Sequence, residues 1–402
     1  MNVLNRNINL EDCYGCSACA QICNKQAIKM LENDEGFLYP RLNSDLCVEC
    51  GLCIKVCPLN EKQTLEKEYP IKVYAIKYQS DSVRFESTSG GAFTALYEYV
   101  LSKQGVVYGA VWEEDRVLGV IHDRADSYSE CSKMRKSKYI QSDLKNTFRQ
   151  IKQDLKDNKL VLFTGTPCQV AGLRSFLGEW VDGKIILVDL ICHAVPSPRI
   201  WRDYIRHIEK VHGKHVIEYI FRTKERGWHI NRNKYILDNH KSYSKNKLSS
   251  IFSELFYKHV ICRNSCYKCA FSSLPHTASD MTIADYWNIR NVNPDFDDNK
   301  GVSLVIINSK KGNDFFECIK AKVDYVESNL KDAIQCNHTK PIKHTLLRNA
   351  FWTDYNQYGY LFAIQKYAHY TWWGNFFFFF KRYIRELISV DQMKYVRKFL
   401  GK

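Results

Sequence analysis

The sequence predicts an α+β or α/β protein with a cysteine-rich module at its N-terminus and a helical, aromatic and basic tail at its C-terminus. Three observations support this fold class. The first 60 residues hold eight of the 16 cysteines, residues 71–330 alternate strand and helix patterns, and aromatic residues and cations dominate after residue 345. A chain of 402 residues is long enough for two or three domains. We place the segments at 1–62, 71–150, 151–335 and 346–402.

The N-terminal module repeats one cysteine spacing, with Cys47 following Cys13 by 34 residues. In each run the gaps are two, two and three residues, which is the spacing of bacterial two-cluster ferredoxins. In that pattern three thiolates hold one 4Fe-4S cluster and the fourth crosses to the other cluster. The spacing therefore predicts one cluster on Cys13, Cys16, Cys19 and Cys57, and a second on Cys47, Cys50, Cys53 and Cys23.

The alternatives for this module are a pair of zinc knuckles or a disulfide knot. Zinc sites usually pair two short CxxC hooks, whereas here three thiols run together twice. Asn24 stands where the first run would normally carry proline, so we expect a looser turn there with the ligands intact. We also expect a short helix after each run, and a linker over residues 61–70, which are polar and end in proline.

Charge is unevenly distributed along the chain. Residues 1–60 carry seven acidic and five basic side chains, a net charge of −2, and the whole chain carries +14, so the remainder carries +16. Such a basic body suits an anionic cofactor, an acidic substrate or an anionic membrane surface, although it is also compatible with a merely solvated surface. We expect no nucleic-acid partner, because the chain has no zinc-finger spacing, RNP-like strand or basic helix-turn-helix pattern.

The cysteine usage also bears on location. Thiols in metal-type spacings, with no apolar signal segment at the N-terminus, indicate a reducing cytoplasm. No stretch gives 18 uninterrupted apolar residues, so we expect no membrane-spanning helix.

The first motifs of the body are a glycine-rich helix start and a basic loop. Strands are expected over 71–78 and 105–112, and the helix between them begins near Phe93, after Ser89, Gly90 and Gly91. A helix start of this kind offers amides and a positive dipole end to a phosphate, although many helices begin this way. The loop 132–141 contains the sequence Ser137-Lys138-Tyr139 among four cations. It is either a solvated surface loop or a phosphate clamp, in which Lys138 would supply the charge and Tyr139 would stack on a planar ring.

Two buried strands end in turns. The strand 160–165 leads into Thr166, Pro167, Cys168 and Gln169 and then a helix, and 184–193 repeats the design before Pro196. Ligands on open α/β sheets bind at such strand ends. We interpret Cys168 as a small wall residue of a cofactor pocket rather than a nucleophile. Neighbours on a strand point to opposite faces, which argues against a catalytic Cys192–His193 pair.

Further cysteines follow in the second half of the body. The spacing Cys262-x-x-x-Cys266-x-x-Cys269 lacks a fourth ligand, for which Cys192 or an aspartate could serve, and it predicts a third metal site or iron–sulfur cluster. Ordinary buried thiols are the alternative. The spacing is also that of the radical-SAM loop, but that loop normally lies early in the chain. Before this group, residues 221–229 combine cations with Trp228 and could line an anionic ligand.

The end of the chain changes character. We expect a strand over 301–308, a helix to about residue 330, and then the tail. Over 371–402 the tail carries Trp372, Trp373, the run Phe376–Phe380 and a basic amphipathic segment. This balance fits an interfacial helix in peripheral contact with the inner membrane face, or a helix that docks on its own domain.

Taken together, these motifs resemble the coenzyme F420 hydrogenase/dehydrogenase beta-subunit family over residues 10–330. The resemblance rests on the double cysteine run, ESTSGGAF, RKSKYIQ, FTGTPCQVAGLR, DLICHAVPSP, FRTKERGW, CYKC and ASDMTIADYW, in that order. It implies an α/β flavin-binding domain that holds FAD and passes electrons between iron–sulfur clusters and a deazaflavin. It also implies FAD contacts around Ser89 to Gly91, Ser137 to Tyr139 and Thr166 to Gln169.

Bacterial relatives of this shape often accompany polysaccharide-synthesis enzymes, and many lack coenzyme F420, which is therefore a doubtful cofactor here. Ala284 stands where relatives usually have glycine. Clusters carry one electron and a flavin accepts one or two, so flavin links a ferredoxin module to two-electron chemistry. We expect an iron–sulfur flavoprotein oxidoreductase served by a redox partner protein or a small electron donor, with no catalytic side chain identified. The alternative is a non-catalytic electron-relay or scaffold subunit of a larger redox complex.

Overall fold

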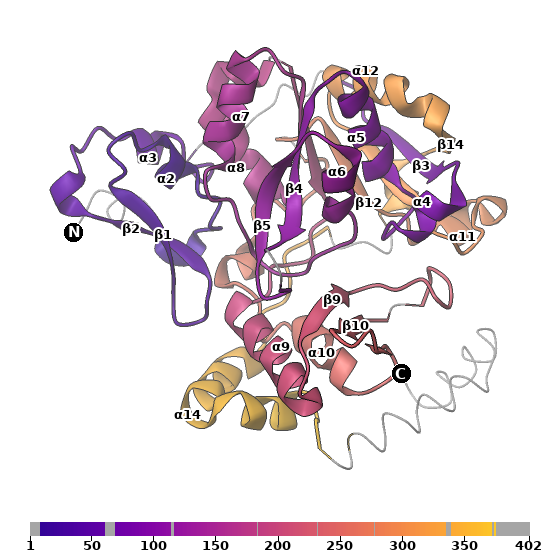
Figure 1. The fold of residues 1–402 in the computed structure, drawn as a ribbon. Coiled ribbons are helices and arrows are strands. Elements are labelled where there is room, and N and C mark those ends of the chain that lie inside the picture. The colour runs from indigo at the N-terminus through magenta and orange to yellow at the C-terminus, as the bar shows by residue number, and fades with distance from the viewer. Residues whose placement is uncertain are drawn as a thin grey trace.

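The computed structural model describes residues 9–60, 69–113, 116–182, 184–230, 232–276, 278–334, 339–371 and 374. These residues form an N-terminal module, an α/β body and a lobe beneath the body (Figure 1). The predicted interfacial segment lies outside the described residues from Trp372 onward, except for Gly374, as does most of the predicted linker. Within the described part, no helix is long and apolar enough to cross a membrane.

The N-terminal module is built from two similar halves. Its elements are η1 (Leu10–Asp12), α2 (Ala18–Ile22), β1 (Ile28–Glu32), β2 (Leu38–Leu42), η2 (Ser44–Leu46) and α3 (Leu52–Lys55), and β1 pairs antiparallel with β2. The two short helices lie inside the cysteine runs, not after them as the sequence suggested. Left-handed residues at Ser17 and Gly51 turn the backbone directly into each helix, which explains this early start.

The described body contains a nine-stranded mixed sheet in the order β14-β3-β13-β12-β8-β7-β4-β5-β6. Its strands are β3 (Lys72–Tyr78), β4 (Val106–Trp112), β5 (Val120–Ala125), β6 (Ser142–Asp143), β7 (Val161–Gly165), β8 (Ile185–Leu190), β12 (Met281–Asp285), β13 (Ser303–Ile307) and β14 (Val323–Ser328). The central strands β4, β7, β8 and β12 are parallel. Segments 71–150 and 151–335 both contribute strands, so they share one sheet.

Alternating side chains of the central strands bury both faces of this sheet. Leu162 and Ile186 pack with helices α5 (Ala92–Ser102), α6 (Tyr128–Met134) and α12 (Lys310–Ile319). Phe163 and Leu187 point the other way, into the core formed with α7 (Thr147–Lys156) and α8 (Pro167–Leu177). This two-residue alternation is what a sheet covered on both sides requires. The strand patterns predicted at 71–78, 105–112, 160–165, 184–193 and 301–308 all correspond to strands of this sheet.

The expected helix to about residue 330 is only partly correct. Helix α12 ends at Ile319, a short η7 (Lys320–Lys322) follows, and β14 then pairs antiparallel with β3 at the sheet edge. The segment reads VDYVES, with Val323 buried and Asp324 exposed. Such an edge strand shows little apolar pattern of its own, so its pairing with β3 decides its structure. The remaining short elements of the body are α4 (Asp81–Phe85), η3 (Gly178–Asp182), α11 (Ile289–Val292), η6 (Pro294–Phe296) and α13 (Leu330–Ala333).

The lobe packs around Trp201, which is fully buried. It contains α9 (Pro198–His212), β9 (Val216–Ile220), β10 (Lys234–Leu237), β11 (Ser242–Tyr243), η4 (Leu248–Ser250), α10 (Ile251–Tyr257), η5 (Asn264–Lys268) and α14 (Leu347–Tyr367). The first helix of the tail segment, α14, contributes Phe351 and Trp352 to this core and is kinked at Gly359. Figure 1 shows the lobe on the side of the body where the β1–β2 hairpin of the module reaches down.

Candidate functional site

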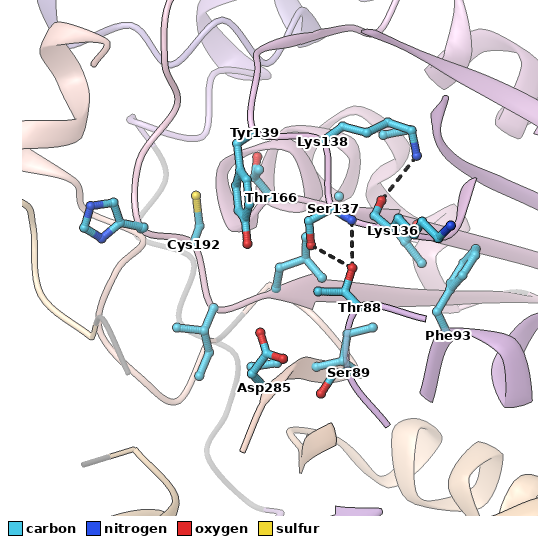
Figure 2. Close-up of a pocket in the computed structure, with 18 of the residues that line it drawn as sticks. Thr88, Ser89, Phe93, Lys136, Ser137, Lys138, Tyr139, Thr166, Cys192 and Asp285 are labelled. Carbon is cyan, nitrogen blue, oxygen red and sulfur yellow. Dashed lines mark hydrogen bonds between the residues drawn. The ribbon is translucent and has the colours of Figure 1, made fainter. Parts of the chain in front are cut away.

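A cavity of about 380 Å³ lies at the carboxyl ends of β7, β8 and β12. Its walls come mainly from residues within the segments 87–93, 134–142, 164–169 and 283–287 and from the whole of 190–196, together with Arg222, Phe256 and Tyr257 from the lobe. Figure 2 shows Tyr139, Thr166 and Cys192 near one another on one side, with Thr88, Ser89 and Phe93 on another. Parallel strand ends in α/β sheets usually form ligand sites, so the topology itself creates this one.

Most of the residues predicted to contact a cofactor come together here. The cavity is lined by Ser89, Gly91, Ser137, Lys138, Tyr139, Thr166 and Gln169, whereas Gly90, Pro167 and Cys168 are adjacent in the chain but are not among its lining residues. Sequence reasoning missed the contributions of Asp285 and Trp287. The sequence could have indicated both residues, because they belong to the DYW motif at the end of a buried strand, and Thr166 stands at the end of another such strand. Ala284, which replaces the usual glycine, also lines the cavity.

The start of α5 is held tightly against the sheet. Gly91 is the N-cap of α5 with a φ of +93°, a conformation that favours glycine. A Cβ on Gly90 would lie 2.5 Å from the backbone nitrogen of Ser303, so this position has no room for a side chain. The Gly90 amide donates to the Ser303 hydroxyl over 2.9 Å. These contacts fix the helix start relative to β3 and β13, with its positive dipole end at the cavity.

The basic loop joins the helix start across the cavity. The Ser137 amide donates to the Thr88 hydroxyl over 2.9 Å, and Figure 2 shows this link. The Lys138 ammonium donates to the carbonyl oxygens of Arg135, at 3.0 Å, and Lys136, at 3.3 Å. Burial lowers the pKa of Lys138 to about 7, and the charge of Lys136 acts in the same direction. Lys138 therefore lines the cavity, and its ammonium group also holds the loop in place through these hydrogen bonds.

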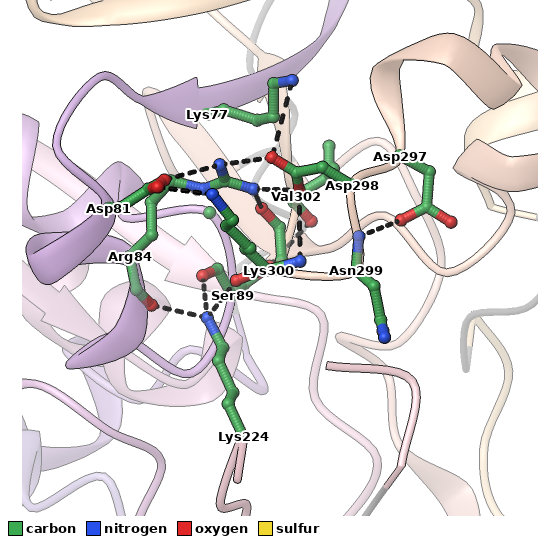
Figure 3. Close-up of polar contacts among 12 residues, drawn as sticks. Lys77, Asp81, Arg84, Ser89, Lys224, Asp297, Asp298, Asn299, Lys300 and Val302 are labelled. Atoms are coloured by element: carbon green, nitrogen blue, oxygen red, sulfur yellow. Dashed lines mark hydrogen bonds and ion pairs between the residues drawn. The ribbon is translucent and has the colours of Figure 1, made fainter. Parts of the chain in front are cut away.

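Lys224 clamps the same region from the lobe. Its ammonium donates to the carbonyl oxygens of Arg84 and Ser89, both at 2.6 Å, and of Lys300 at 2.8 Å (Figure 3). Burial lowers the pKa of Lys224 to about 7. The guanidinium of Arg84 pairs with Asp298 behind this point. The clamp ties the lobe to the segment that begins α5.

An ion pair forms the cavity wall beside Tyr139. Arg222 pairs with Asp285, and the Trp228 indole donates to the other oxygen of Asp285 over 3.0 Å. The Arg222 guanidinium carbon lies 4.4 Å from the ring centroid of Trp287, which itself stacks on Trp228 at 4.9 Å. The sequence suggested that residues 221–229 could line an anionic ligand, and the structure places Arg222 in the wall. Trp228 is buried behind it.

Helix α8 connects the cavity to the N-terminal module. Its first turn carries a capping box between Thr166 and Gln169, which explains why the strand end passes directly into a helix. One and a half turns later, a Cβ on Gly172 would lie 2.8 Å from the Sγ of Cys16. The absence of a side chain at residue 172 is what lets the first cysteine run approach the body this closely.

Both cysteine runs show a backbone suited to cluster binding. Amides donate to cysteine sulfurs over 3.4 Å in each run: Gly15 to Cys13, Ala27 to Cys23, and Glu49 to Cys47. Such bonds stabilise thiolates that bind iron. Burial raises the pKa of Cys16 and Cys19, and the charges of neighbouring cysteines add to the increase, so a bound cation would be needed to hold them as thiolates.

The second cysteine group has an additional neighbour in Cys168, which the sequence spacing did not suggest. Burial raises the pKa of Cys192. The charges of Cys266, Cys168 and Cys269 raise it further, and the charge of Cys262 adds a smaller increase. The Sγ of Cys262 donates to the Phe256 carbonyl over 3.8 Å. Cys168 therefore acts on Cys192 together with Cys262, Cys266 and Cys269.

Tyr14 places the first cysteine run beside this second group. Its hydroxyl accepts from the Ala270 amide over 2.9 Å and donates to the Lys268 carbonyl over 3.3 Å. In the described residues no three His, Cys, Asp or Glu side chains are arranged to hold a single metal ion. The four thiolates of a cubane each bind a different iron, so they stand further apart than the ligands of one ion.

Comparisons with known proteins agree with this organisation. Residues 158–332 match the family model for the C terminus of the coenzyme F420 hydrogenase/dehydrogenase beta subunit, and residues 12–60 match the model "4Fe-4S dicluster domain". The coenzyme F420-dependent sulfite reductase of Methanocaldococcus jannaschii is 27% identical over 176 residues, which cover 42% of this chain and 26% of that protein. The match thus spans about a quarter of the length of this curated relative.

A solved chain of the F420-reducing [NiFe] hydrogenase complex from Methanosarcina barkeri is also similar. It shares 17% sequence identity, the match covers 74% of this chain and 92% of that chain, and the TM-score is 0.46. Residues 158–332 are thus similar to the C terminus of the coenzyme F420 hydrogenase/dehydrogenase beta subunit, and residues 12–60 are similar to 4Fe-4S dicluster domains.

Proposed function

We propose that the chain is an iron–sulfur flavoprotein oxidoreductase that passes electrons between two 4Fe-4S clusters and a noncovalent FAD in the cavity. One observation carries this proposal: α8 touches both sites. Gly172 packs on Cys16, and Thr166, six residues earlier, lines the cavity. At about 1.5 Å per residue this separation is about 9 Å along the helix. Electrons leaving the first cysteine run therefore have a short path to a cofactor in the cavity.

The clusters are assigned by the ferredoxin pattern. Cys13, Cys16, Cys19 and Cys57 would hold the first cluster, and Cys47, Cys50, Cys53 and Cys23 the second. The amide-to-sulfur bonds in both runs support this assignment. Clusters supply single electrons, and FAD would supply the exchange between one-electron and two-electron chemistry.

The cavity residues would bind and orient FAD rather than transfer protons themselves. The start of α5 offers its positive dipole end to the pyrophosphate, and the loop carrying Ser137 and Lys138 closes over the same place. Tyr139 forms an aromatic wall, with Phe221 5.1 Å from its ring centroid. Arg222 brings a buried cation to the wall beside Tyr139. Together these groups suit an anionic, planar ligand.

We further propose a third cluster held by Cys168, Cys192, Cys266 and Cys269, in place of the set with Cys262. Tyr14 contacts the 268–270 segment, so this cluster would lie between the first cysteine run and the cavity. Replacing Cys168 by Ser should reduce iron per chain, whereas replacing Cys262 by Ser should leave it unchanged. Equal iron in both variants, with the two dicluster sites full, would show that these are structural thiols.

We propose the electron donor and the final acceptor by chemical class only. We propose a protein or small-molecule donor, a cytoplasmic location with peripheral membrane contact through 371–402, and an acceptor in polysaccharide biosynthesis, the role that the family resemblance implies. Comparing vesicle binding of the full chain with that of a chain ending at residue 370 tests the membrane contact. Equal binding to anionic vesicles at low salt would contradict it.

Anaerobic purification followed by iron, sulfide and flavin analysis tests the main proposal. We expect iron and sulfide for at least two cubanes, and one FAD per chain after reconstitution. A protein that takes up no FAD would leave the electron-relay role as the better explanation. Turnover by the purified chain with an artificial donor separates an enzyme from a relay subunit, because a relay has no substrate of its own.

The pH dependence of FAD binding tests the position of the pyrophosphate. The pKa of Lys138 is about 7 without a ligand, because burial disfavours its charged form. A bound anion beside it would raise that pKa, so binding would take up a proton and weaken as the pH rises above 7. We expect the Kd for FAD, measured by flavin fluorescence, to increase between pH 7 and pH 9. The variant Lys138→Met should bind more weakly and lose this dependence, and an unchanged dependence would place the pyrophosphate elsewhere.

A further inference from the structure

Arg263 is a buried cation in the contact between the N-terminal module and the body. The residue is 1% exposed. Its Nε donates to the carbonyl oxygen of Cys13 over 2.8 Å, and its Nη2 donates to the carbonyl oxygen of Leu38 over 3.0 Å. The guanidinium carbon lies 4.0 Å from the ring centroid of Tyr39. The side chain thus reaches from the second cysteine group into the module, beside the first cysteine of the first run.

Among the described residues, Arg263 donates hydrogen bonds only to neutral groups, and its charge also acts on the thiols of Cys168 and Cys266. Its remaining bond is to the side-chain oxygen of Gln141 at 3.4 Å, and the described residues give it no ion pair with a carboxylate. Glu35, whose carboxylate feels the charge of Arg263, is held by Arg348. Buried charges in proteins are normally paired, because removing a charge from water is costly. The arrangement is therefore incomplete without an anion.

We infer that the counter-ion of Arg263 is the 4Fe-4S cluster of the first cysteine run, and that Arg263 raises the reduction potential of that cluster. This inference rests on the proposed ligation by Cys13, Cys16, Cys19 and Cys57. A cubane held by four thiolates is a net anion, and each added electron increases its negative charge. Burial alone makes such a cluster harder to reduce, whereas a fixed cation in a region of low dielectric favours the reduced form.

The second cluster has a weaker counterpart in Arg149, on α7. Its Nε donates to the Gln21 carbonyl over 2.6 Å, and its Nη2 donates to the carbonyl of Cys23 over 2.9 Å. Arg149 is only half-buried, so water screens its charge more than that of Arg263. The two arginines together favour electron flow from the second cluster to the first, and onward to the cavity.

Potentiometric titration monitored by EPR tests this role on the full-length, cluster-loaded chain. The variants Cys50→Ser and Cys168→Ser together identify the signal of the first cluster, because they remove a ligand of the second cluster and a ligand of the proposed third cluster. Arg263→Gln keeps hydrogen-bonding capacity and removes the charge, and Arg263→Lys keeps the charge. Arg149→Gln is the matched control, because it removes an interface arginine of the same kind from the other cluster.

We expect Arg263→Gln to lower the reduced-to-oxidised ratio of the first cluster about tenfold at a given potential, which is about 59 mV for one electron. Arg263→Lys should restore most of this shift, and Arg149→Gln should leave the first cluster unchanged. An unshifted first cluster in Arg263→Gln, or equal shifts in the Gln and Lys variants, would overturn the inference.

Iron content separates the remaining outcomes. Loss of first-run iron in Arg263→Gln but not in Arg263→Lys would support the role of the charge, because the cluster would then need its counter-ion to bind. Equal loss in both variants would indicate a packing role and overturn the inference. Absence of clusters from the unaltered chain would instead refute the proposed function, so the two failures are distinguishable.

Discussion

The two cysteine runs of the N-terminal module have nearly the same backbone in very different surroundings. Each opens with a 3-10 turn capped by an asparagine, in which Asn9 accepts from the Glu11 amide and Asn43 from the Asp45 amide. Each then passes through two left-handed residues. These have φ values of 69° and 62° at Gly15 and Ser17, and of 50° and 75° at Glu49 and Gly51. The local chain path is therefore a property of the repeated cysteine spacing.

The surroundings decide which side chains these positions carry. A Cβ on Gly15 would lie 2.5 Å from the amide nitrogen of Gln141 and 2.8 Å from the Leu38 carbonyl, whereas a Cβ on Gly51 would have no neighbour within 4 Å. Glu49 adopts the same left-handed conformation as Gly15 without being glycine. Glycine at residue 15 is thus required by the packed body rather than by φ alone. The comparison teaches that the first run is specialised for contact with the body.

The second run is specialised for contact with solvent or a partner. Its Cys50 is exposed, and the neighbouring apolar side chains Leu46, Val48 and Leu52 are 49%, 61% and 40% exposed. An exposed apolar surface around a redox centre is typical of the small, transient interfaces between electron-transfer proteins. We therefore expect electrons to enter at the second run and leave through the first.

The largest expected effect comes from removing one ligand in each run. Cys50→Ser should remove about half of the dicluster iron, because each cluster depends on its own four thiolates. Cys16→Ser should remove the same amount and also lower the thermal midpoint of the chain, since Cys16 packs against α8. Iron analysis and anaerobic thermal unfolding measure both effects. Unchanged iron in Cys50→Ser would contradict the ligand assignment, and equal thermal midpoints would contradict the asymmetry.

An exchange of side chains between the runs should have a moderate effect. Gly15→Glu copies the second run into the first and forces atoms into Gln141 and Leu38, so we expect a loss of about 1–3 kcal/mol of stability. The reverse change, Glu49→Gly, alters an exposed position and should stay within about 0.5 kcal/mol. Comparison of thermal midpoints with full cluster occupancy checks the pair. A gain in Glu49→Gly as large as the loss in Gly15→Glu would mean that the backbone conformation, not the body, requires glycine.

The smallest expected effect concerns partner access. Val48→Asp places a charge beside exposed Cys50 and should weaken docking of a reduced ferredoxin used as donor by about 1 kcal/mol, which raises its KM about fivefold. Reduction by dithionite, which needs no protein interface, should keep its rate. The control Val211→Asp changes a similarly exposed apolar residue in the lobe. Equal effects of both variants on the ferredoxin reaction would argue against entry at the second run.

The candidate site could be predicted in part because several of its pieces are local. The glycine-rich start of α5, the capping box of α8 and the strand ends at Gly165 and Leu190 each depend on residues within one or two turns. The sheet rule then places those strand ends at one edge. The pairing of Thr88 with Ser137 follows from neither pattern, yet it joins the two motifs that the resemblance assigned to one cofactor.

Other features could not be predicted, because they depend on residues far apart in the chain. Asp285 meets Arg222 across 63 residues, and Lys224 reaches Arg84 across 140. Cys168, on α8, lies close enough to Cys192 to raise its pKa, although the spacing of the second cysteine group does not include it. Lys138 was expected to offer its charge to a phosphate, and the fold also commits that charge to the carbonyls of its own loop.

By itself the sequence determined the local chemistry of this protein: the two cysteine runs, the strand ends beside the cavity, and five of the strands in the sheet of the body. These depend on spacing and on backbone preferences that act over a few residues. Only the tertiary structure decided which run is buried, which thiols gather near the cavity, and where Arg263 places its charge. Those outcomes depend on how whole surfaces pack, and a buried charge or a missing Cβ acquires its meaning only from the neighbours that the fold supplies.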